Sequence, residues 1–506
     1  MIKTIGLLLL SLLLQSCRAE KTVPLWGIFE SEVRSNNSYT NPFRDVDLLV
    51  RVTRPDGSHF NQYGFFDGQA TWKFRIMPGM EGKWKYRAEM TDSSAYLERE
   101  FTCVKGDLNG PLEPYDNNPV WPAYCGFNPV QIRCFHTGDR FFASNFSDKE
   151  RKRFLDWVQQ QGYNMLSVGS HYLNRQQTGR GNGWQTPRLW PPDPDEYRRM
   201  ESILSELEKR NIYIHPFAGF FGRAAEWPVD HDAQELYIRY TLARIGAFRN
   251  IILNVGGPEP LLKPEEYQNG NMTRADINRV ALLIKKHDTY SHMLSVHNRT
   301  GNGKGDYEQD PFIYEKWEDY STLQGAKSTD LDETYKFITE SRKIVKPVFA
   351  HEVMWYGNMY HEGLDPETLR KKAITLIMAG AFINFGDMNG NSSSGFSGCL
   401  NPDSASLQAH RIIKTVWDIF DALPFYELTP IDSLVDNAFC MSDGSGKHLI
   451  YSPHGDSFSV KFPLPVSGRW ISPADGTVKP VSISSCEVTP PDKNDWILYI
   501  NGESKP

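Results

Sequence analysis

Two glutamates in this chain of 506 residues follow short apolar segments of strand-like length. Glu259 comes after residues 251–255, and Glu352 comes after residues 347–351. These are the fourth and seventh of eight apolar segments that alternate with helical patterns. In a barrel of parallel strands the C-terminal strand ends open onto one rim, where side chains distant in sequence converge. Two convergent carboxyl groups can cleave a glycosidic bond, so this spacing predicts a sugar-cleaving enzyme.

The local sequence gives the two glutamates different expected roles. Pro258 and Pro260 restrict the loop around Glu259, and a carboxyl group in a walled cleft would have the raised pKa that a general acid needs. A solvated loop glutamate is the alternative. Glu352 lies shortly before Trp355, which is unusual for a surface carboxylate, and in its ionised form it would be a nucleophile. A structural ion pair at the barrel rim is the alternative for Glu352.

The eight apolar segments also predict the fold class. They cover residues 141–145, 164–168, 211–217, 251–255, 292–296, 320–324, 347–351 and 381–385. Most intervals hold an amphipathic helix, and Ser147 with Glu150 forms a capping box that opens the first. Since parallel strands need crossover helices, the alternation predicts an α/β fold, a (β/α)₈ TIM barrel over residues 135–426. A doubly wound open sheet is the alternative, although no G-x-G-x-x-G motif follows a predicted strand.

Two β-rich regions flank the predicted barrel. Residues 22–104 contain segments that alternate apolar and polar residues, separated by turn sequences such as Pro55-Asp-Gly57, and they predict an N-terminal β-sandwich. Residues 105–134 are rich in proline, glycine and asparagine and predict a linker. Residues 427–506 return to short strand patterns and predict a C-terminal β-sandwich.

Residues 1–21 resemble a bacterial lipoprotein signal peptide with a short tether. The apolar stretch 7–14 is too short for a stable spanning helix. The sequence Leu14-Gln15-Ser16-Cys17 resembles a lipobox, so Cys17 is the expected lipidation site. A lipid anchor would attach the protein to a membrane of the bacterial cell envelope, in the periplasm or at the outer membrane. A plain secretory signal with a chance cysteine is the alternative.

Charge and cysteine content bear on other classes of protein. The net charge of −7 and the absence of a basic run argue against a nucleic-acid partner. The cysteines after Cys17 show no metal-binding spacing, and we expect neither a metal site nor a cofactor. Export permits disulfides, but six cysteines allow fifteen pairings, and buried free thiols are an equal alternative.

The barrel pattern resembles the apiosidase-like glycoside hydrolases, which are part of a clan of retaining enzymes with catalytic glutamates after strands four and seven. The resemblance implies that Glu259 is the acid/base and Glu352 the nucleophile. The N-terminal region is similar to the β-sandwich that precedes such barrels in bacterial polysaccharide-degrading proteins, and the C-terminal region to the small β-domain that often follows them. The matching N-terminal residues are Trp26-Gly-Ile-Phe-Glu30, Asn41-Pro-Phe43, Gly64-Phe-Phe-Asp-Gly68 and Trp72.

The chain departs from the family pattern at two places. The clan usually carries an asparagine before the strand-four glutamate to hold the sugar's 2-hydroxyl, but Pro258 stands there. Either Asn254 or His297 takes that role, or substrate recognition differs, or activity is lost. At the predicted first strand, Ser144 and Asn145 replace the acidic residue often seen in the apiosidase-like group, so a specificity for apiose is not transferred.

Several residues at or just beyond the predicted strand ends are candidates for sugar binding. Aromatic rings stack on sugar faces, while histidine, asparagine and aspartate can bond hydroxyl groups; packing, capping or a turn is the ordinary alternative for each. The candidates are His171, His215, Asn254, His297, Trp355, Asn384 and Asp387.

These observations together predict an exported, lipid-anchored retaining glycoside hydrolase of a plant or algal polysaccharide or its oligosaccharides. A non-catalytic glycan-binding lipoprotein on a degenerate barrel is one alternative, and Pro258 motivates it. A polysaccharide lyase is another, but it would need a lysine, tyrosine or histidine base, and no such cluster is evident in the sequence.

Overall fold

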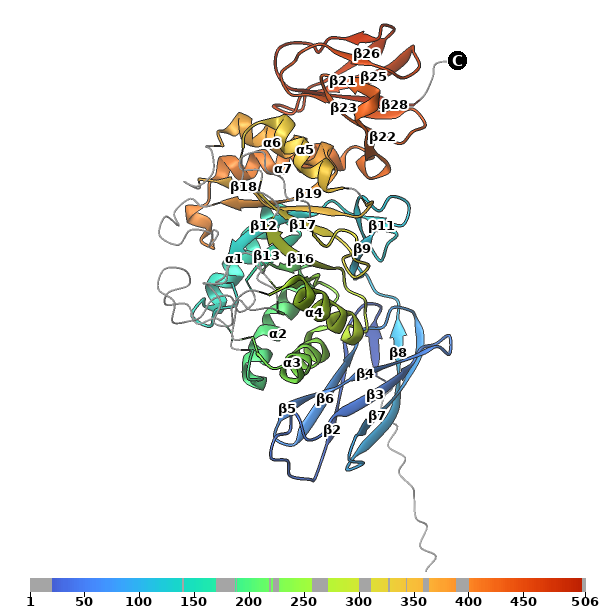
Figure 1. Ribbon diagram of the computed structural model, residues 1–506, viewed down its shortest axis with the longest axis vertical. Coiled ribbons are helices and arrows are strands. Elements are labelled where there is room, and N and C mark those ends of the chain that lie inside the picture. The colour runs from blue at the N-terminus through green and yellow to red at the C-terminus, as the bar shows by residue number, and fades with distance from the viewer. Residues whose placement is uncertain are drawn as a thin grey trace, which may run out of the picture.

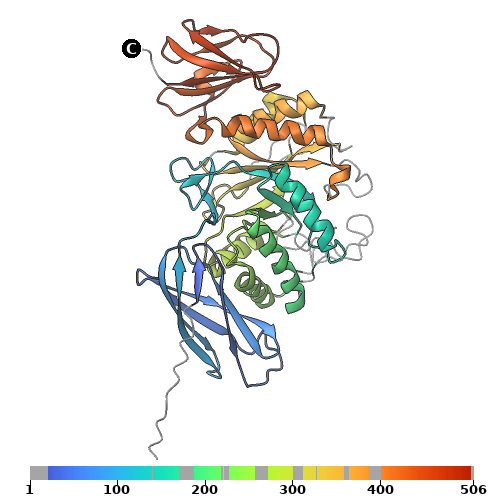
Figure 2. The same ribbon diagram turned by 180° about the vertical axis from the view of Figure 1, so that it is seen from behind.

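The computed structural model describes three successive bodies along an elongated molecule, with a barrel between two β-domains (Figure 1, Figure 2). The description covers residues 21–138, 141–169, 187, 189–217, 220–221, 227–256, 272–299, 311–325, 328–342, 344–357, 364–387 and 400–502.

The central body is a (β/α)₈ TIM barrel, as the sequence predicts. Its parallel sheet has the order β14-β13-β12-β19-β18-β17-β16-β15. The backbone N–H of Ile214 donates to Asn250 O, and that of Ile252 donates to Ile214 O, so the two edges of the sheet join. The strands are β12 (Arg133–Gly138), β13 (Met165–Val168), β14 (Tyr213–Pro216), β15 (Leu253–Val255), β16 (Leu294–Arg299), β17 (Ser321–Gln324), β18 (Val348–Tyr356) and β19 (Ala381–Asp387).

Helices surround this sheet and begin where the sequence offers a cap. Ser147 and Glu150 form the predicted capping box at the start of α1, and Thr273 and Asp276 form another at α4. The described helices are α1 (Asp148–Gln160), α2 (Pro194–Lys209), α3 (His231–Ile245), α4 (Arg274–His287), α5 (Leu331–Ser341), α6 (Pro366–Met378) and α7 (Leu407–Asp421).

The first barrel strand is not at residues 141–145, so that prediction was wrong. The strand is β12, whose polar residues His136 and Thr137 interrupt the apolar pattern. Residues 141–146 form turns instead, because the Arg151 guanidinium donates to the carbonyls of Phe141, Ala143 and Phe146. Ser144 and Asn145 therefore do not mark the end of a barrel strand.

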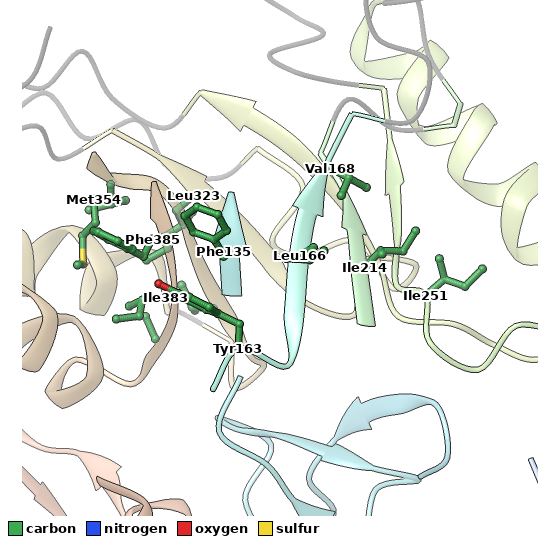
Figure 3. Close-up of a cluster of buried hydrophobic side chains, with 14 of the residues drawn as sticks. Phe135, Tyr163, Leu166, Val168, Ile214, Ile251, Leu323, Met354, Ile383 and Phe385 are labelled. Atoms are coloured by element: carbon green, nitrogen blue, oxygen red, sulfur yellow. The ribbon is translucent and has the colours of Figure 1, made fainter. Parts of the chain in front are cut away.

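The barrel strands alternate between inward-facing and outward-facing residues, and the two faces differ in chemistry. Outward residues such as Phe135, Leu166, Ile214 and Ile383 belong to the apolar core shared with the helices (Figure 3). Inward residues near the N-terminal strand ends form a separate apolar cluster. That cluster contains Cys134, Met165, Tyr213, Ile252, Met293, Tyr320, Phe349 and Phe382.

The next inward position along each strand, two residues further on, is polar in all eight strands. Strand side chains repeat with a period of two, so these residues form a second layer above the apolar cluster. All are buried. The layer consists of His136, Ser167, His215, Asn254, Ser295, Thr322, His351 and Asn384.

The N-terminal body packs two antiparallel sheets, β1-β8-β7-β3-β4 and β2-β6-β5, around a core that includes Trp72 and Trp84. Strand β1 alone pairs in parallel, with β8. Residues 105–134 hold a small sheet of β9 (Leu112–Pro114), β10 (Pro122–Tyr124) and β11 (Asn128–Pro129) before β12 begins. The sandwich strands are β1 (Thr22–Pro24), β2 (Phe29–Arg34), β3 (Leu48–Thr53), β4 (His59–Tyr63), β5 (Phe65–Gly68), β6 (Thr71–Ile76), β7 (Gly82–Met90) and β8 (Tyr96–Val104).

Buried charges join the N-terminal sandwich to the barrel. Glu201 on α2 accepts hydrogen bonds from Arg244 on α3 and from Arg75 on β6. Arg244 also lies 3.0 Å from the Asp67 carboxylate of β5. Burial alone would raise the pKa of Glu201, but the two guanidinium groups outweigh it and hold this pKa below its usual value.

The C-terminal body also consists of two sheets, β20-β22-β23-β28-β25-β26 and β21-β24-β27. It contacts the barrel through Tyr335 of α5, whose ring stacks on Phe439, and through Arg370 of α6, which donates to Asp495. Its strands are β20 (Thr429–Pro430), β21 (Val435–Asp436), β22 (Phe439–Ser442), β23 (Lys447–Ser452), β24 (Phe458–Val460), β25 (Val466–Ile471), β26 (Val478–Ile483), β27 (Glu487–Val488) and β28 (Trp496–Asn501).

Two further findings concern cysteines and membranes. The five cysteines within the described ranges are free thiols, namely Cys103, Cys125, Cys134, Cys440 and Cys486. None of the described helices has the length and apolar character needed to cross a membrane.

Candidate active site

A β-bulge in β18 brings Glu352 into the barrel interior. Leu323 of β17 pairs with Ala350, but the next residue, Gln324, pairs with Glu352, so His351 is an extra residue in β18. Successive strand residues normally face opposite sides, and a bulge re-aims them. His351 and Glu352 consequently contact the same inward neighbour, His297. The strand continues to Tyr356, so Glu352 lies inside β18 rather than after its end as predicted.

The Glu352 carboxylate is buried and lies among polar side chains. Its Oε2 atom accepts a hydrogen bond of 3.0 Å from Nε2 of Gln324. Its Oε1 atom lies 3.8 Å from Nε2 of His297 and 3.9 Å from Nδ1 of His351. One oxygen is thus fixed by an amide, while the other faces two imidazole rings.

His351 is the centre of a group of buried histidines. Its Nε2 atom lies 2.5 Å from Oγ of Ser167, and its Nδ1 atom lies 3.2 Å from Nε2 of His297. Its ring centroid is 4.9 Å from that of His215 and 5.4 Å from that of His136. Burial, reinforced by the neighbouring histidines, holds the pKa of His351 and of His215 well below the usual value, so both rings are neutral at pH 7.

Three predicted binding residues carry unused hydrogen-bonding atoms. Asn254 donates from Nδ2 to Phe217 O, and Asn384 donates from Nδ2 to His351 O. Within the described part of the chain, Oδ1 of both asparagines and Nε2 of His215 are buried without a hydrogen-bond partner. Buried polar atoms without a protein partner usually bind water or a ligand. These atoms therefore favour a polar ligand inside this end of the barrel.

Two other predicted residues, Trp355 and Asp387, contact protein groups. Trp355 is 2% exposed, and its ring packs edge-on against His136 at 4.6 Å. Asp387, the last residue of β19, has no exposed area; its carboxylate accepts hydrogen bonds from N and Oγ of Ser406 and lies 3.0 Å from Nε2 of His410. Asp387 therefore links the end of β19 to the start of α7.

Three predicted positions lie outside the described residues, namely Cys17, His171 and Glu259. The strand that precedes Glu259, β15, ends at Val255. Together with Glu352, the predicted residues His215, Asn254, His297 and Asn384 all belong to the inward-facing interior of the barrel.

Sequence reasoning missed His136, Ser167, Gln324 and His351 as parts of this group. His136 was missed because the first strand was misplaced. The other three follow an inward apolar residue by two or four positions, as Ser167 follows Met165. Every second residue of a strand faces the same side, so counting from the inward apolar residue of each predicted strand would have identified them.

A parallel eight-stranded barrel with a carboxylate among polar inward residues near the C-terminal strand ends defines a TIM-barrel protein of the glycoside hydrolase type. Residues 135–393, just over half of the chain, match the family described as the apiosidase-like catalytic domain. The chain therefore belongs to this apiosidase-like family. Residues 22–91 match a domain of unknown function, DUF5060.

Solved structures share the fold at low sequence identity. A candidate glycoside hydrolase from Bacteroides vulgatus ATCC 8482 has a TM-score of 0.74 at 16% identity, with 95% of this chain and 99% of that chain covered. A family 5 glycoside hydrolase from the same organism has a TM-score of 0.57 at 16% identity, and the match covers 78% of this chain and 94% of that chain. No curated protein matches the chain. The family match and these folds support a carbohydrate-cleaving barrel.

Proposed function

We propose that this protein is a retaining glycoside hydrolase in which Glu352 is the nucleophile and Glu259 the acid/base. The observation that carries the proposal is the bulge in β18, which turns the Glu352 carboxylate into a layer of polar side chains inside an apiosidase-like barrel. Among the described side chains, Glu352 contacts the Gln324 amide and lies close to His297 and His351.

The proposed reaction is a double displacement. Gln324 holds Oε2 of Glu352, so Oε1 can bond to the anomeric carbon while the leaving oxygen takes a proton from Glu259. Glu259 then accepts a proton from water, whose oxygen replaces Glu352 at the same carbon. Retention of configuration requires the two carboxyl groups to be about 5–5.5 Å apart.

We propose a plant or algal polysaccharide or its oligosaccharides, because the open atoms of Asn254, Asn384 and His215 suit hydroxyl groups and because β-domains flank the barrel. Asn254 is the group proposed to replace the asparagine that Pro258 displaces. The lipobox-like sequence supports export and lipid attachment through Cys17 to the cell envelope. Mass spectrometry of the mature N-terminus, which should begin at a lipid-modified Cys17, tests that part.

A substrate panel tests the activity. Purified protein is incubated with poly- and oligosaccharides, and reducing-end release is measured for the wild type, Glu352→Gln, Glu259→Gln and the control Glu367→Gln. Glu367 is a solvent-exposed glutamate of α6. We expect release by the wild type and the control, and a loss of orders of magnitude in both site variants. Unchanged turnover in either site variant would refute the role proposed for that residue.

Two other outcomes of the panel correspond to the alternative functions. Saturable oligosaccharide binding without release would identify a glycan-binding protein. Products that carry an unsaturated, ultraviolet-absorbing sugar would identify a lyase.

A further inference from the structure

Three ligand-type atoms from two barrel strands converge beside the Glu352 carboxylate. They are Nε2 of His297 on β16, Nδ1 of His351 on β18 and Oε1 of Glu352. The three separations are 3.2, 3.8 and 3.9 Å. An ion at the centre of this triangle would lie about 2.1 Å from each atom, and Zn–N distances are about 2.0–2.1 Å. The three atoms are therefore close enough together to contact one ion.

The bulge in β18 explains how this group arises. Adjacent strand residues would normally point to opposite faces, but the extra residue lets both His351 and Glu352 face inward toward His297. All three side chains are buried, with Glu352 7% exposed and the histidines at 1% or less. The ligand atoms are therefore held on strands rather than on loops, which limits their freedom before an ion arrives.

Two of the three side chains form hydrogen bonds with residues outside the ligand group, and these bonds fix their orientation. Ser167 bonds Nε2 of His351, which leaves Nδ1 directed at His297. Gln324 bonds Oε2 of Glu352, which leaves Oε1 directed at the histidines. Metal-binding histidines and carboxylates usually have such second partners, which set the ligand's tautomer and direction.

We propose that His297, His351 and Glu352 bind a divalent transition-metal ion such as Zn²⁺. Two histidines and one glutamate are a known zinc ligand set, and three protein ligands leave a coordination position open for water or a sugar hydroxyl. Metal bound through Oε1 of Glu352 prevents that oxygen from attacking an anomeric carbon. This inhibition of the nucleophile rests on the proposed function, whereas metal binding itself does not.

Cobalt titration of the full mature chain, purified without a histidine tag, tests the site. The visible absorption of bound Co²⁺ is followed, and Zn²⁺ is added to displace it. The variants are His297→Gln, Glu352→Gln and Ser167→Ala, with His448→Gln as the matched control. His448 is a buried histidine of β23 in the C-terminal body, where its ring stacks on Phe462, so it lies outside the proposed ligand group. Circular dichroism and thermal unfolding verify that each variant is folded.

We expect one Co²⁺ per wild-type chain, displaced by one equivalent of Zn²⁺. The two ligand variants should lose the signal, Ser167→Ala should bind about 10–100-fold more weakly, and the control should bind like the wild type. A folded wild type that binds no metal overturns the proposal. If His297→Gln and Glu352→Gln bind Co²⁺ as tightly as the wild type, the proposal is also overturned, because the ion would then lie elsewhere.

Turnover measurements separate this proposal from the proposed function. If the protein cleaves sugars, one equivalent of Zn²⁺ should abolish turnover and a chelator should restore it. Bound Zn²⁺ that leaves turnover unchanged refutes Oε1 of Glu352 as a ligand. If the protein cleaves no substrate, the cobalt titration still decides whether the metal site exists.

Discussion

The replacement Glu201→Gln should weaken the junction between the N-terminal sandwich and the barrel. Glu201 accepts from Nε of Arg244 at 2.5 Å, from Nη2 of Arg244 at 3.0 Å and from Nη2 of Arg75 at 2.9 Å. The Arg244 side chain has no exposed area and that of Glu201 is 6% exposed. Removal of the carboxylate charge therefore leaves two buried guanidinium groups with less compensation than before.

The size of the effect follows from what remains at the junction. Breaking a buried ion pair by removing one partner costs about 3–5 kcal/mol. Arg244 retains Asp67 at 3.0 Å, and Arg75 retains Glu30 at 2.8 Å. The lower end, about 3 kcal/mol in the free energy of unfolding, is therefore expected. The matched control is Glu206→Gln on the same helix, whose partly exposed pair with Arg210 should contribute about 0–1 kcal/mol.

The stability contribution of Glu201 should also change with pH in a defined direction. The folded-state pKa of Glu201 lies below its usual value of 4.5, so its contribution is present above pH 4.5 and is lost as the pH falls through the lowered pKa. Urea unfolding of both variants and the wild type, followed by tryptophan fluorescence from pH 3 to 8, measures the difference. A cost equal to that of Glu206→Gln, or one that grows in acid, would refute the reasoning.

Two further predictions concern other parts of the barrel. Burial lowers the pKa of His292, but the Asp288 carboxylate outweighs it and raises the pKa above 6.5. The stability advantage of the wild type over His292→Gln should therefore be full below pH 6.5 and decline as the pH rises through the raised pKa, as urea unfolding at several pH values can show; an advantage that grows with pH contradicts this. A Cβ atom on Gly386 would lie 2.3 Å from Cε3 of Trp355. The replacement Gly386→Ala should therefore lower the free energy of unfolding by about 1–3 kcal/mol and reduce turnover. A variant with an unchanged melting temperature would contradict this prediction.

The sequence predicted most of the fold because the outward face of each strand is apolar. Segments such as 164–168 and 381–385 contain enough apolar residues to be recognised, and capping residues such as Ser147 marked a helix start. The first strand was misplaced because its inward positions include polar His136, whereas the apolar 141–143 stretch packs in turns under Arg151.

The candidate site could be predicted only in part. Glu352 and His297 were identified by their place near strand ends, but the sequence does not reveal the bulge that turns His351 and Glu352 to the same side. The proposed metal-ligand group was not predicted, because His297 lies on another strand, 54 residues before His351. Asp387 was predicted to contact sugar; its hydrogen bonds to Ser406, 19 residues further along the chain, could not be inferred from local sequence.

Trapping of a covalent glycosyl-enzyme tests the central claim most directly. The wild type and Glu352→Gln are mixed with the 2-deoxy-2-fluoro glycoside of the sugar that the panel identifies, and the digested proteins are analysed by mass spectrometry. Fluorine slows both steps of a retaining reaction, and an activated leaving group on the reagent restores the first step alone, so the intermediate accumulates. The account predicts one glycosyl unit on the wild-type peptide that contains Glu352 and none on the variant. A glycosyl unit on another residue, or a product with inverted configuration and no labelled peptide, would contradict it.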